Sequence, residues 1–145
     1  MGQDSLVNLE IENGRKLIDH LATNGFDVHL AFWVKETDAG RWYLYLASPL
    51  VDEKGPLVAY GIAIPLVESV PEFGIGPFSI KVVGLQDSMT MAARKAIRPR
   101  VPSGPFAVKS PKPYPGMTRV NGTTLAGVDI DGAYIYPPLH SATPA

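Results

Sequence analysis

The chain has 145 residues, of which 46% are hydrophobic and 19% are charged, and it contains no cysteine. This composition predicts one globular domain with its own core and excludes a disulfide framework, a thiolate metal site and a cysteine nucleophile. No apolar run approaches the roughly 20 residues of a membrane span, and residues 1–12 lack the pattern of a signal peptide, so we expect a soluble, cytoplasmic protein with no membrane partner.

Charge is unevenly distributed along the chain. Residues 1–80 carry five Lys or Arg against eleven Asp or Glu, whereas residues 81–145 carry eight against three. No acidic residue occurs from Ser88 to Val128. The asymmetry predicts either an anionic partner for the second half, or halves that neutralise each other within one fold or in a head-to-tail oligomer.

A helix followed by a β-hairpin is predicted at the start of the chain. Ser5–Asn24 has apolar residues at helical spacing and ends at Asn24-Gly25, although Gly14 weakens its middle. Phe26–Glu36 and Arg41–Ser48 are rich in aromatic and β-branched residues and flank a turn at 37–40, which predicts a hairpin.

The next segment, Asp52–Val70, predicts a second helix. Pro56 suits a first turn, and Pro65 is expected to kink or shorten the helix. Its expected buried face is apolar and consists of Leu57, Tyr60, Ile64 and Val67.

A third strand and a third helix are predicted next. Phe78–Leu85 alternates as a strand does, and Asp87 or Ser88 can cap a short helix that runs to Ile97. Six prolines between Pro99 and Pro115 predict an extended, basic arm.

The C-terminal part predicts a small β unit. Asn121-Gly122 and Asp131-Gly132 have the composition of turns, and Ala133–Tyr136 reads as a short strand.

These elements predict an α+β fold. We expect a single-layer antiparallel or mixed sheet with helices packed on one face, in the order α-β-β-α-β-α, followed by the Pro-rich arm and the C-terminal β unit. Within one domain overall, residues 1–98 form the expected core, 99–116 the arm, and 117–145 a hairpin and tail that pack on the core.

Three strings of this sequence are distinctive: AFWVK, RWYLYLASPLVDEKGP and DGAYIYPP. They resemble strings in a group of small uncharacterised bacterial proteins. The resemblance covers most of residues 15–85 and the tail, and it implies no activity that can be transferred.

Alternation divides the predicted hairpin into two faces. The first face is apolar and is expected to pack under the helices: Val28, Leu30, Phe32, Val34, Trp42, Leu44 and Leu46. The second face, to which strand three adds Lys81, mixes rings with cations: His29, Ala31, Trp33, Lys35, Arg41, Tyr43, Tyr45 and Ala47. An open face of this kind is a stacking platform for single-stranded nucleic acid, unless the arm or the C-terminal strand covers it and makes a second core.

Candidate binding residues are the aromatic side chains of the second face and the cations of the second half. They are Trp33, Lys35, Arg41, Tyr43, Tyr45, Lys81, Arg94, Arg98, Arg100, Lys109, Lys112 and Arg119. If the arm is a docking segment, replacing Arg100, Lys109 and Lys112 with Ser leaves folding intact and weakens partner binding in a salt-dependent manner.

Catalytic signals are weak. No histidine pair has metal-ligand spacing, and a helix cap and a turn account for the acidic pairs Asp52-Glu53 and Asp129/Asp131. We therefore expect no metal, no cofactor and no catalytic set. The best remaining candidate for catalysis is His29 as a base, with Arg41 and Tyr43 stabilising a phosphate.

The sequence therefore favours a non-enzymatic accessory or adaptor module that docks on a larger protein or nucleoprotein assembly. One alternative is direct binding of RNA or single-stranded DNA through the aromatic face and the basic arm. A second alternative is a small metal-independent nuclease-like enzyme. The identity of the partner and the oligomeric state stay open.

Overall fold

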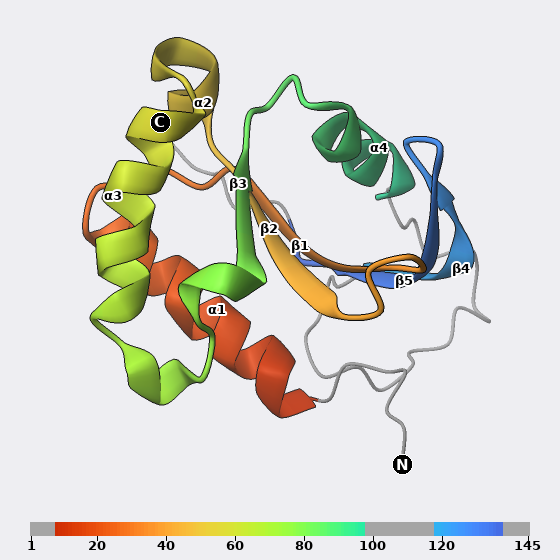
Figure 1. Cartoon of the computed structure of the whole chain (residues 1–145), viewed down its shortest axis with the longest axis horizontal. Helices are drawn as coiled ribbons and strands as arrows, with labels where there is room; N and C mark the ends of the chain where they lie inside the picture. Colours follow the sequence, from red (N-terminus) through yellow and green to blue (C-terminus); the bar gives the residue numbers. More distant parts are fainter. Residues whose placement is uncertain (1–7, 98–117, 138–145) are drawn as a thin grey trace, which may run out of the picture.

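The computed structural model describes residues 8–97 and 118–137. In chain order its helices and strands are α1 (Asn8–Thr23), β1 (Leu30–Glu36), β2 (Trp42–Ala47), α2 (Pro49–Lys54), α3 (Pro56–Glu68), the 3-10 turns η1 (Pro71–Phe73) and η2 (Pro77–Ser79), β3 (Ile80–Val83), α4 (Ser88–Ala96), β4 (Thr118–Leu125) and β5 (Val128–Ile135). The strands form one sheet in the order β3-β2-β1-β5-β4 (Figure 1). The α+β class and the order of the first six predicted elements are confirmed.

The sheet is mixed. β3 runs parallel to β2, and the other neighbours are antiparallel. β5 pairs directly with β1 and lies between β1 and β4, so the C-terminal strands extend the main sheet. Strands that are distant in sequence therefore share one continuous ladder.

Helices cover both faces of the sheet (Figure 1). α1 and α3 pack on one face, against β-residues that include Ala31, Leu44 and Leu46. α4 packs on the other face through Met89 and Ala93. The expectation that all helices lie on one face is therefore wrong. Both faces of the hairpin are apolar, and each needs its own cover to leave water.

The helix predicted over Asp52–Val70 is two helices. α2 begins earlier than expected, where the Ser48 hydroxyl accepts a hydrogen bond from the Leu50 N–H at 3.1 Å, and it stops at Gly55, whose φ is +93°. Pro65 lies inside α3 and does not end it. The expected buried face is wrong in part, because Leu57 is 85% exposed and the fully buried side chains of α3 are small: Ala59, Ala63 and Val67.

The caps at the other helices follow the sequence more closely. α1 stops at Asn24-Gly25 as predicted, with the Phe26 N–H donating back to the Leu21 carbonyl at 2.9 Å. Asp87 caps α4 by accepting from the Met89 N–H at 3.0 Å. Each of these helix ends depends on residues only a few positions apart, so the local sequence is enough to predict it.

Asp52 lies in the first turn of α2, but it caps a different segment. Its carboxylate accepts hydrogen bonds from the backbone N–H groups of Leu85, at 2.6 Å, and Gln86, at 3.3 Å. Gly84 leaves room for it, because a Cβ there would lie 2.6 Å from Oδ1 of Asp52. The carboxylate thus ties α2 to the turn between β3 and α4.

We expect Asp52→Ala to lower the free energy of unfolding by about 1–3 kcal/mol, since it removes two hydrogen bonds to a charged acceptor. Chemical denaturation of this variant measures the loss. Glu53→Ala, at the adjacent exposed position, is the matched control and is expected to be nearly neutral. Equal effects of the two substitutions would show that the turn does not depend on this cap.

The predicted C-terminal turns are both wrong. Asn121-Gly122 lies inside β4, where Asn121 pairs with Gly132. The connection between β4 and β5 is Ala126-Gly127, with φ of +54° and +78°, as a two-residue hairpin turn requires. Asp131-Gly132 lies inside β5, where the register against β1 shifts between Lys35 and Glu36.

Candidate functional site

The register of the first hairpin decides which side chains share a face. Phe32 pairs with Tyr45, and Trp33 pairs with Leu44. Tyr43 and Tyr45 therefore share a face with Phe32, whereas Trp33 lies with Trp42, Leu44 and Leu46 on the opposite face. The predicted division of the hairpin is wrong, because a loop of four residues pairs even-numbered positions with odd-numbered ones.

Of the two alternatives for the aromatic second face, an open stacking platform and a covered second core, the open platform is wrong. Trp33 is 4% exposed and Tyr45 is equally buried. α1 and α3 cover the sheet face that carries Trp33, and α4 covers the face that carries Tyr45. The alternative of a second core holds for the Tyr45 face, with α4 as the cover in place of the arm or the C-terminal strand.

Four of the candidate binding residues gather on the α4 side of the sheet. The Arg41 guanidinium lies 4.8 Å and the Lys81 ammonium 4.6 Å from the centre of the Tyr43 ring. Lys81 also lies 5.6 Å from the Tyr45 ring. The expectation that Lys81 joins the face of these tyrosines is confirmed by its pairing with Tyr45.

Tyr45 is a buried phenol at the base of this cluster. Its ring stacks on Phe32, with centroids 5.1 Å apart, and its hydroxyl donates to Oε2 of Glu36 at 2.9 Å. Burial first, and then the bond to Glu36, raise the pKa of Tyr45 well above its usual value. The phenol therefore stays neutral and acts as a structural donor.

The remaining predicted cations are dispersed. Arg94 is exposed in the last turn of α4. Arg119 lies on β4 with its guanidinium 5.4 Å from the centre of the Tyr134 ring. Four of the predicted residues lie outside the described residues: Arg98, Arg100, Lys109 and Lys112.

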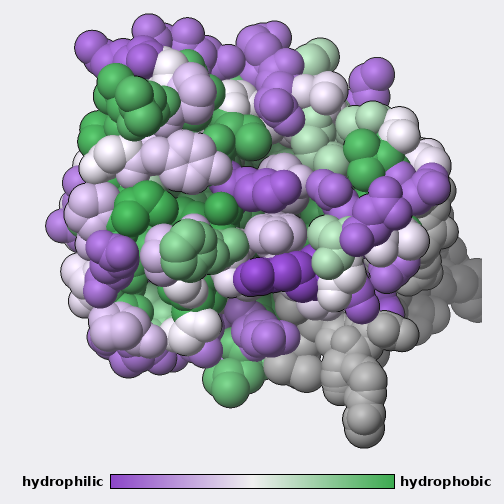
Figure 2. Space-filling view, viewed as in Figure 1, coloured by the Kyte–Doolittle hydropathy of each residue, from purple (hydrophilic) through white to green (hydrophobic). Residues whose placement is uncertain are grey.

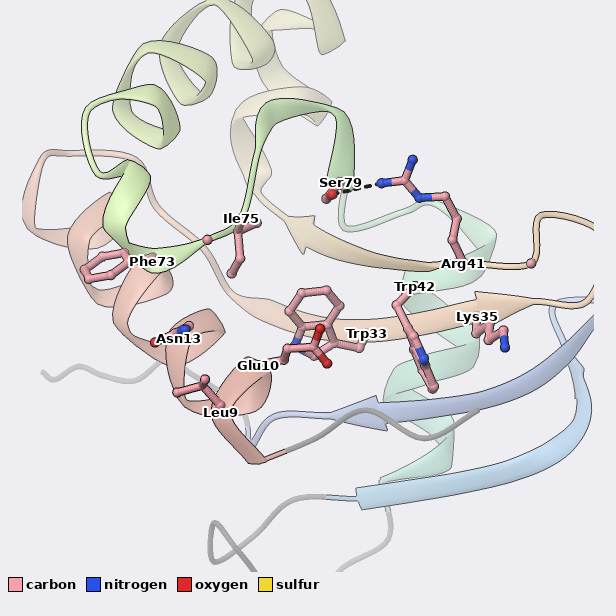
Figure 3. A pocket seen from close by; sticks show the side chains of 12 residues that line it. Leu9, Glu10, Asn13, Trp33, Lys35, Arg41, Trp42, Phe73, Ile75 and Ser79 are labelled. Atoms are coloured by element: carbon pink, nitrogen blue, oxygen red, sulfur yellow. Dashed lines mark hydrogen bonds between the residues drawn. The ribbon is translucent and has the colours of Figure 1, made fainter. Parts of the chain in front are cut away.

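A pocket of about 500 Å³ lies on the opposite side of the hairpin, between α1, the segment from η1 to η2, and the strands (Figure 3). It brings together three predicted residues, Trp33, Lys35 and Arg41. Its other lining residues are Leu9, Glu10, Asn13, Gly40, Trp42, Phe73, Gly74, Ile75 and Ser79. None of these residues was predicted as a site residue. The even number of residues in the hairpin loop would have indicated that Trp42 and Trp33 lie on the same face.

The polar side chains of the pocket differ in whether they already have a hydrogen-bond or ion-pair partner. Arg41 donates from Nη2 to Oγ of Ser79 at 2.9 Å, and Lys35 lies 3.8 Å from Asp131. Trp33 donates from Nε1 to the Tyr136 hydroxyl at 2.9 Å. The Nε1–H of Trp42 is buried and has no partner among the described residues.

A second surface feature belongs to α3. This helix carries no charged residue before Glu68, and its outward side chains form what we call the α3 outer stripe: Pro56, Leu57, Val58, Gly61, Ile62 and Pro65. Val58 is 43% and Ile62 40% exposed. Apolar surface gathers on the side of the molecule where α3 lies (Figure 2).

The candidate catalytic set does not assemble. His29 donates its backbone N–H to Ala47, at the far end of β2 from the loop, and its ring bonds to Asp27 at 3.0 Å. His29 is five residue steps along the extended chain from Val34, the partner of Tyr43, which is roughly 17 Å at about 3.3 Å per residue. The proposed base therefore lies too far from Arg41 and Tyr43 to act with them.

Within residues 8–97 and 118–137, no group of three or more His, Asp or Glu side chains is placed to hold a metal ion. No helix of these two ranges is long and apolar enough to cross a bilayer.

Comparison with protein families adds no relative to this description. No family model, no curated protein and no solved structure matches the chain.

Proposed function

We propose that this protein is a non-enzymatic docking module that binds a partner protein through the α3 outer stripe. The observation that carries the proposal is that α3 is apolar on all sides, yet only one side is buried. A helix with this composition belongs in a core, and a contiguous apolar surface on a soluble chain is typical of an interaction site.

The occupant best suited to the stripe is an apolar groove on a protein. Val58, Ile62 and Pro65 are spaced i, i+4 and i+7, as helix-in-groove anchors are. The exposed Leu57 precedes Val58 and widens this apolar surface. The stripe is flanked by four acidic residues and one basic residue: Asp52, Glu53, Lys54, Glu68 and Glu72. Acidic flanks repel the anionic surface of a membrane and favour a groove with a basic rim.

Binding of RNA or single-stranded DNA has less support. Trp33 and Tyr45 are buried, and the Tyr43 ring already has two cations within 5 Å. A stacked base would have to displace one of these cations from the ring. This alternative therefore depends on the basic arm, which lies outside the described residues.

The proposal is tested with the tagged full chain, purified from its native host with whatever it binds. We expect Leu57→Ser/Ile62→Ser to reduce recovery of the partner at least about tenfold, because apolar anchors carry most of the energy of such interfaces. Met91→Ser is the matched control, since Met91 is 45% exposed on α4, on the other face of the sheet. Its recovery of the partner is expected to equal that of the wild type.

Three controls test folding of the variants, binding through nucleic acid, and self-association. Melting temperatures close to the wild type are expected for all variants, because the replaced side chains are exposed. Loss of the partner after nuclease treatment would favour nucleic-acid binding over protein docking. Sedimentation that shows only self-association through the stripe, with no second protein, would overturn the proposal of a separate partner.

A further inference from the structure

The two tryptophans of the chain, Trp33 and Trp42, line one pocket although they belong to different strands. Figure 3 shows their indoles on the hairpin side, with Phe73 and Ile75 on the opposite side. A cavity of about 500 Å³ that combines aromatic and aliphatic walls with several polar side chains has the size of small-molecule sites.

In the described part of the chain, two buried side-chain nitrogens have no hydrogen-bond partner, Nε of Arg15 and Nε1 of Trp42, and of these two residues only Trp42 lines the pocket. The corresponding N–H of Trp33 donates to the Tyr136 hydroxyl and serves the core. Buried donors are nearly always paired in native proteins, so an unpaired one at a pocket indicates a missing acceptor. A ring nitrogen or carbonyl of a heteroaromatic molecule supplies such an acceptor.

The charge at the hairpin end of the pocket is positive. Arg41 is exposed, donates to Ser79 and lies over the Tyr43 ring, so two contacts hold its guanidinium at the rim, and further N–H donors of the group remain available. Lys35, which lies 3.8 Å from Asp131, is a second cation of the lining. Glu10, from α1, is the one acidic side chain among the described lining residues. A ligand that reaches this end therefore benefits from carrying an anionic group.

We propose that this pocket binds a small planar heteroaromatic molecule that carries an anionic group. The ring packs against the indoles of Trp33 and Trp42 and accepts a hydrogen bond from Trp42, and the anion lies at Arg41. The inference does not depend on the α3 outer stripe, since none of the pocket's lining residues belongs to α3.

Tryptophan fluorescence tests the proposal directly, because both tryptophans of the chain line the pocket. The probes are the four ribonucleoside 5′-monophosphates with their nucleosides, and nicotinate with its neutral amide, nicotinamide. Emission of the full chain is excited at the red edge of the indole band and titrated with each probe. We expect a saturable change with at least one anionic probe and a weaker affinity for its neutral counterpart. A response to nicotinate alone assigns the site to non-nucleotide members of the class.

Two variants separate the contacts. Trp42→Phe keeps an aromatic ring but removes the donor, and it is expected to weaken binding about tenfold. Arg41→Gln is expected to abolish the preference for the anionic probe over its neutral counterpart. At high salt the wild type is expected to lose this preference too, so that the two proteins no longer differ. Arg94→Gln, at an exposed arginine of α4, is the matched control and is expected to bind as the wild type does.

Two results would contradict the proposal. No saturable change with any probe up to millimolar concentration would overturn it. Equal affinity for anionic and neutral probes in the wild type would overturn the role of Arg41. Because Arg41 is exposed, Arg41→Gln folds even if Trp42→Phe does not, and its titration still decides the outcome.

Discussion

Tyr136→Phe is expected to lower the free energy of unfolding by about 2–4 kcal/mol, because it strands two buried polar groups at once. The Tyr136 hydroxyl donates to the Ile11 carbonyl at 2.6 Å and accepts from Nε1 of Trp33 at 2.9 Å. Both aromatic side chains are buried. Urea denaturation measures the loss, with the slope against denaturant expected to stay unchanged.

Tyr134→Phe is the matched control for this prediction. Tyr134 is two residues away and half-buried, and its hydroxyl makes no hydrogen bond to the described residues. We expect a change below about 0.5 kcal/mol. Equal losses at the two tyrosines would show that the chain from Trp33 through Tyr136 to Ile11 does not stabilise the fold.

Gly14 belongs to the same network. A Cβ at Gly14 would collide with the Tyr136 hydroxyl and lie 3.1 Å from Nε1 of Trp33. In an open helix interior Gly→Ala stabilises by about 1 kcal/mol, whereas here we expect Gly14→Ala to destabilise. The penalty should shrink or reverse in the Tyr136→Phe background, since the colliding oxygen is gone. Additive effects of the two substitutions would contradict this coupling.

Phe32→Ala is expected to cost about 3–5 kcal/mol, as truncation of a fully buried aromatic side chain usually does. Phe32 is fully buried under α4, and its ring stacks on Tyr45 with an interplanar angle of 10°. A double-mutant cycle between Phe32 and Tyr45 is expected to give a coupling energy of about 0.5–1.5 kcal/mol.

The cycle also tests the hairpin register. Phe32 and Leu44 lie on opposite faces of the sheet, so a second cycle between them is expected to give a coupling energy near zero. The register predicted from the sequence would require the reverse, with coupling between Phe32 and Leu44 and none between Phe32 and Tyr45. Thermal or chemical unfolding of the wild type, the three single variants and the two double variants distinguishes the two registers.

The sequence by itself determined the features that depend on neighbouring residues. The α+β class, the order of the first elements, the hairpin loop, the stop at Gly25 and the cap at Asp87 were all predicted and confirmed. Each rests on helical or strand periodicity or on a side chain that bonds its own backbone within a few residues. Such signals are complete within a short window of sequence.

The candidate site was predicted only in part. Trp33 and Lys35 do line one pocket, and Tyr43, Tyr45 and Lys81 do lie close together, but on the other side of the hairpin. Arg41, next to the hairpin loop, belongs to the pocket lining and also lies over the Tyr43 ring. The two groups were expected on one open face. Their separation follows from a shift of one residue in the assumed pairing, which moves a whole strand's side chains to the opposite face.

Only the tertiary structure decided how distant segments meet. β5 enters between β1 and β4, α4 covers the second sheet face, and Asp52 caps a turn more than thirty residues away. The same is true of Gly14, which weakens α1 in isolation yet admits the Tyr136 hydroxyl. These contacts join residues far apart in the chain, and their energy depends on complementary shape and on paired donors, which no local pattern encodes.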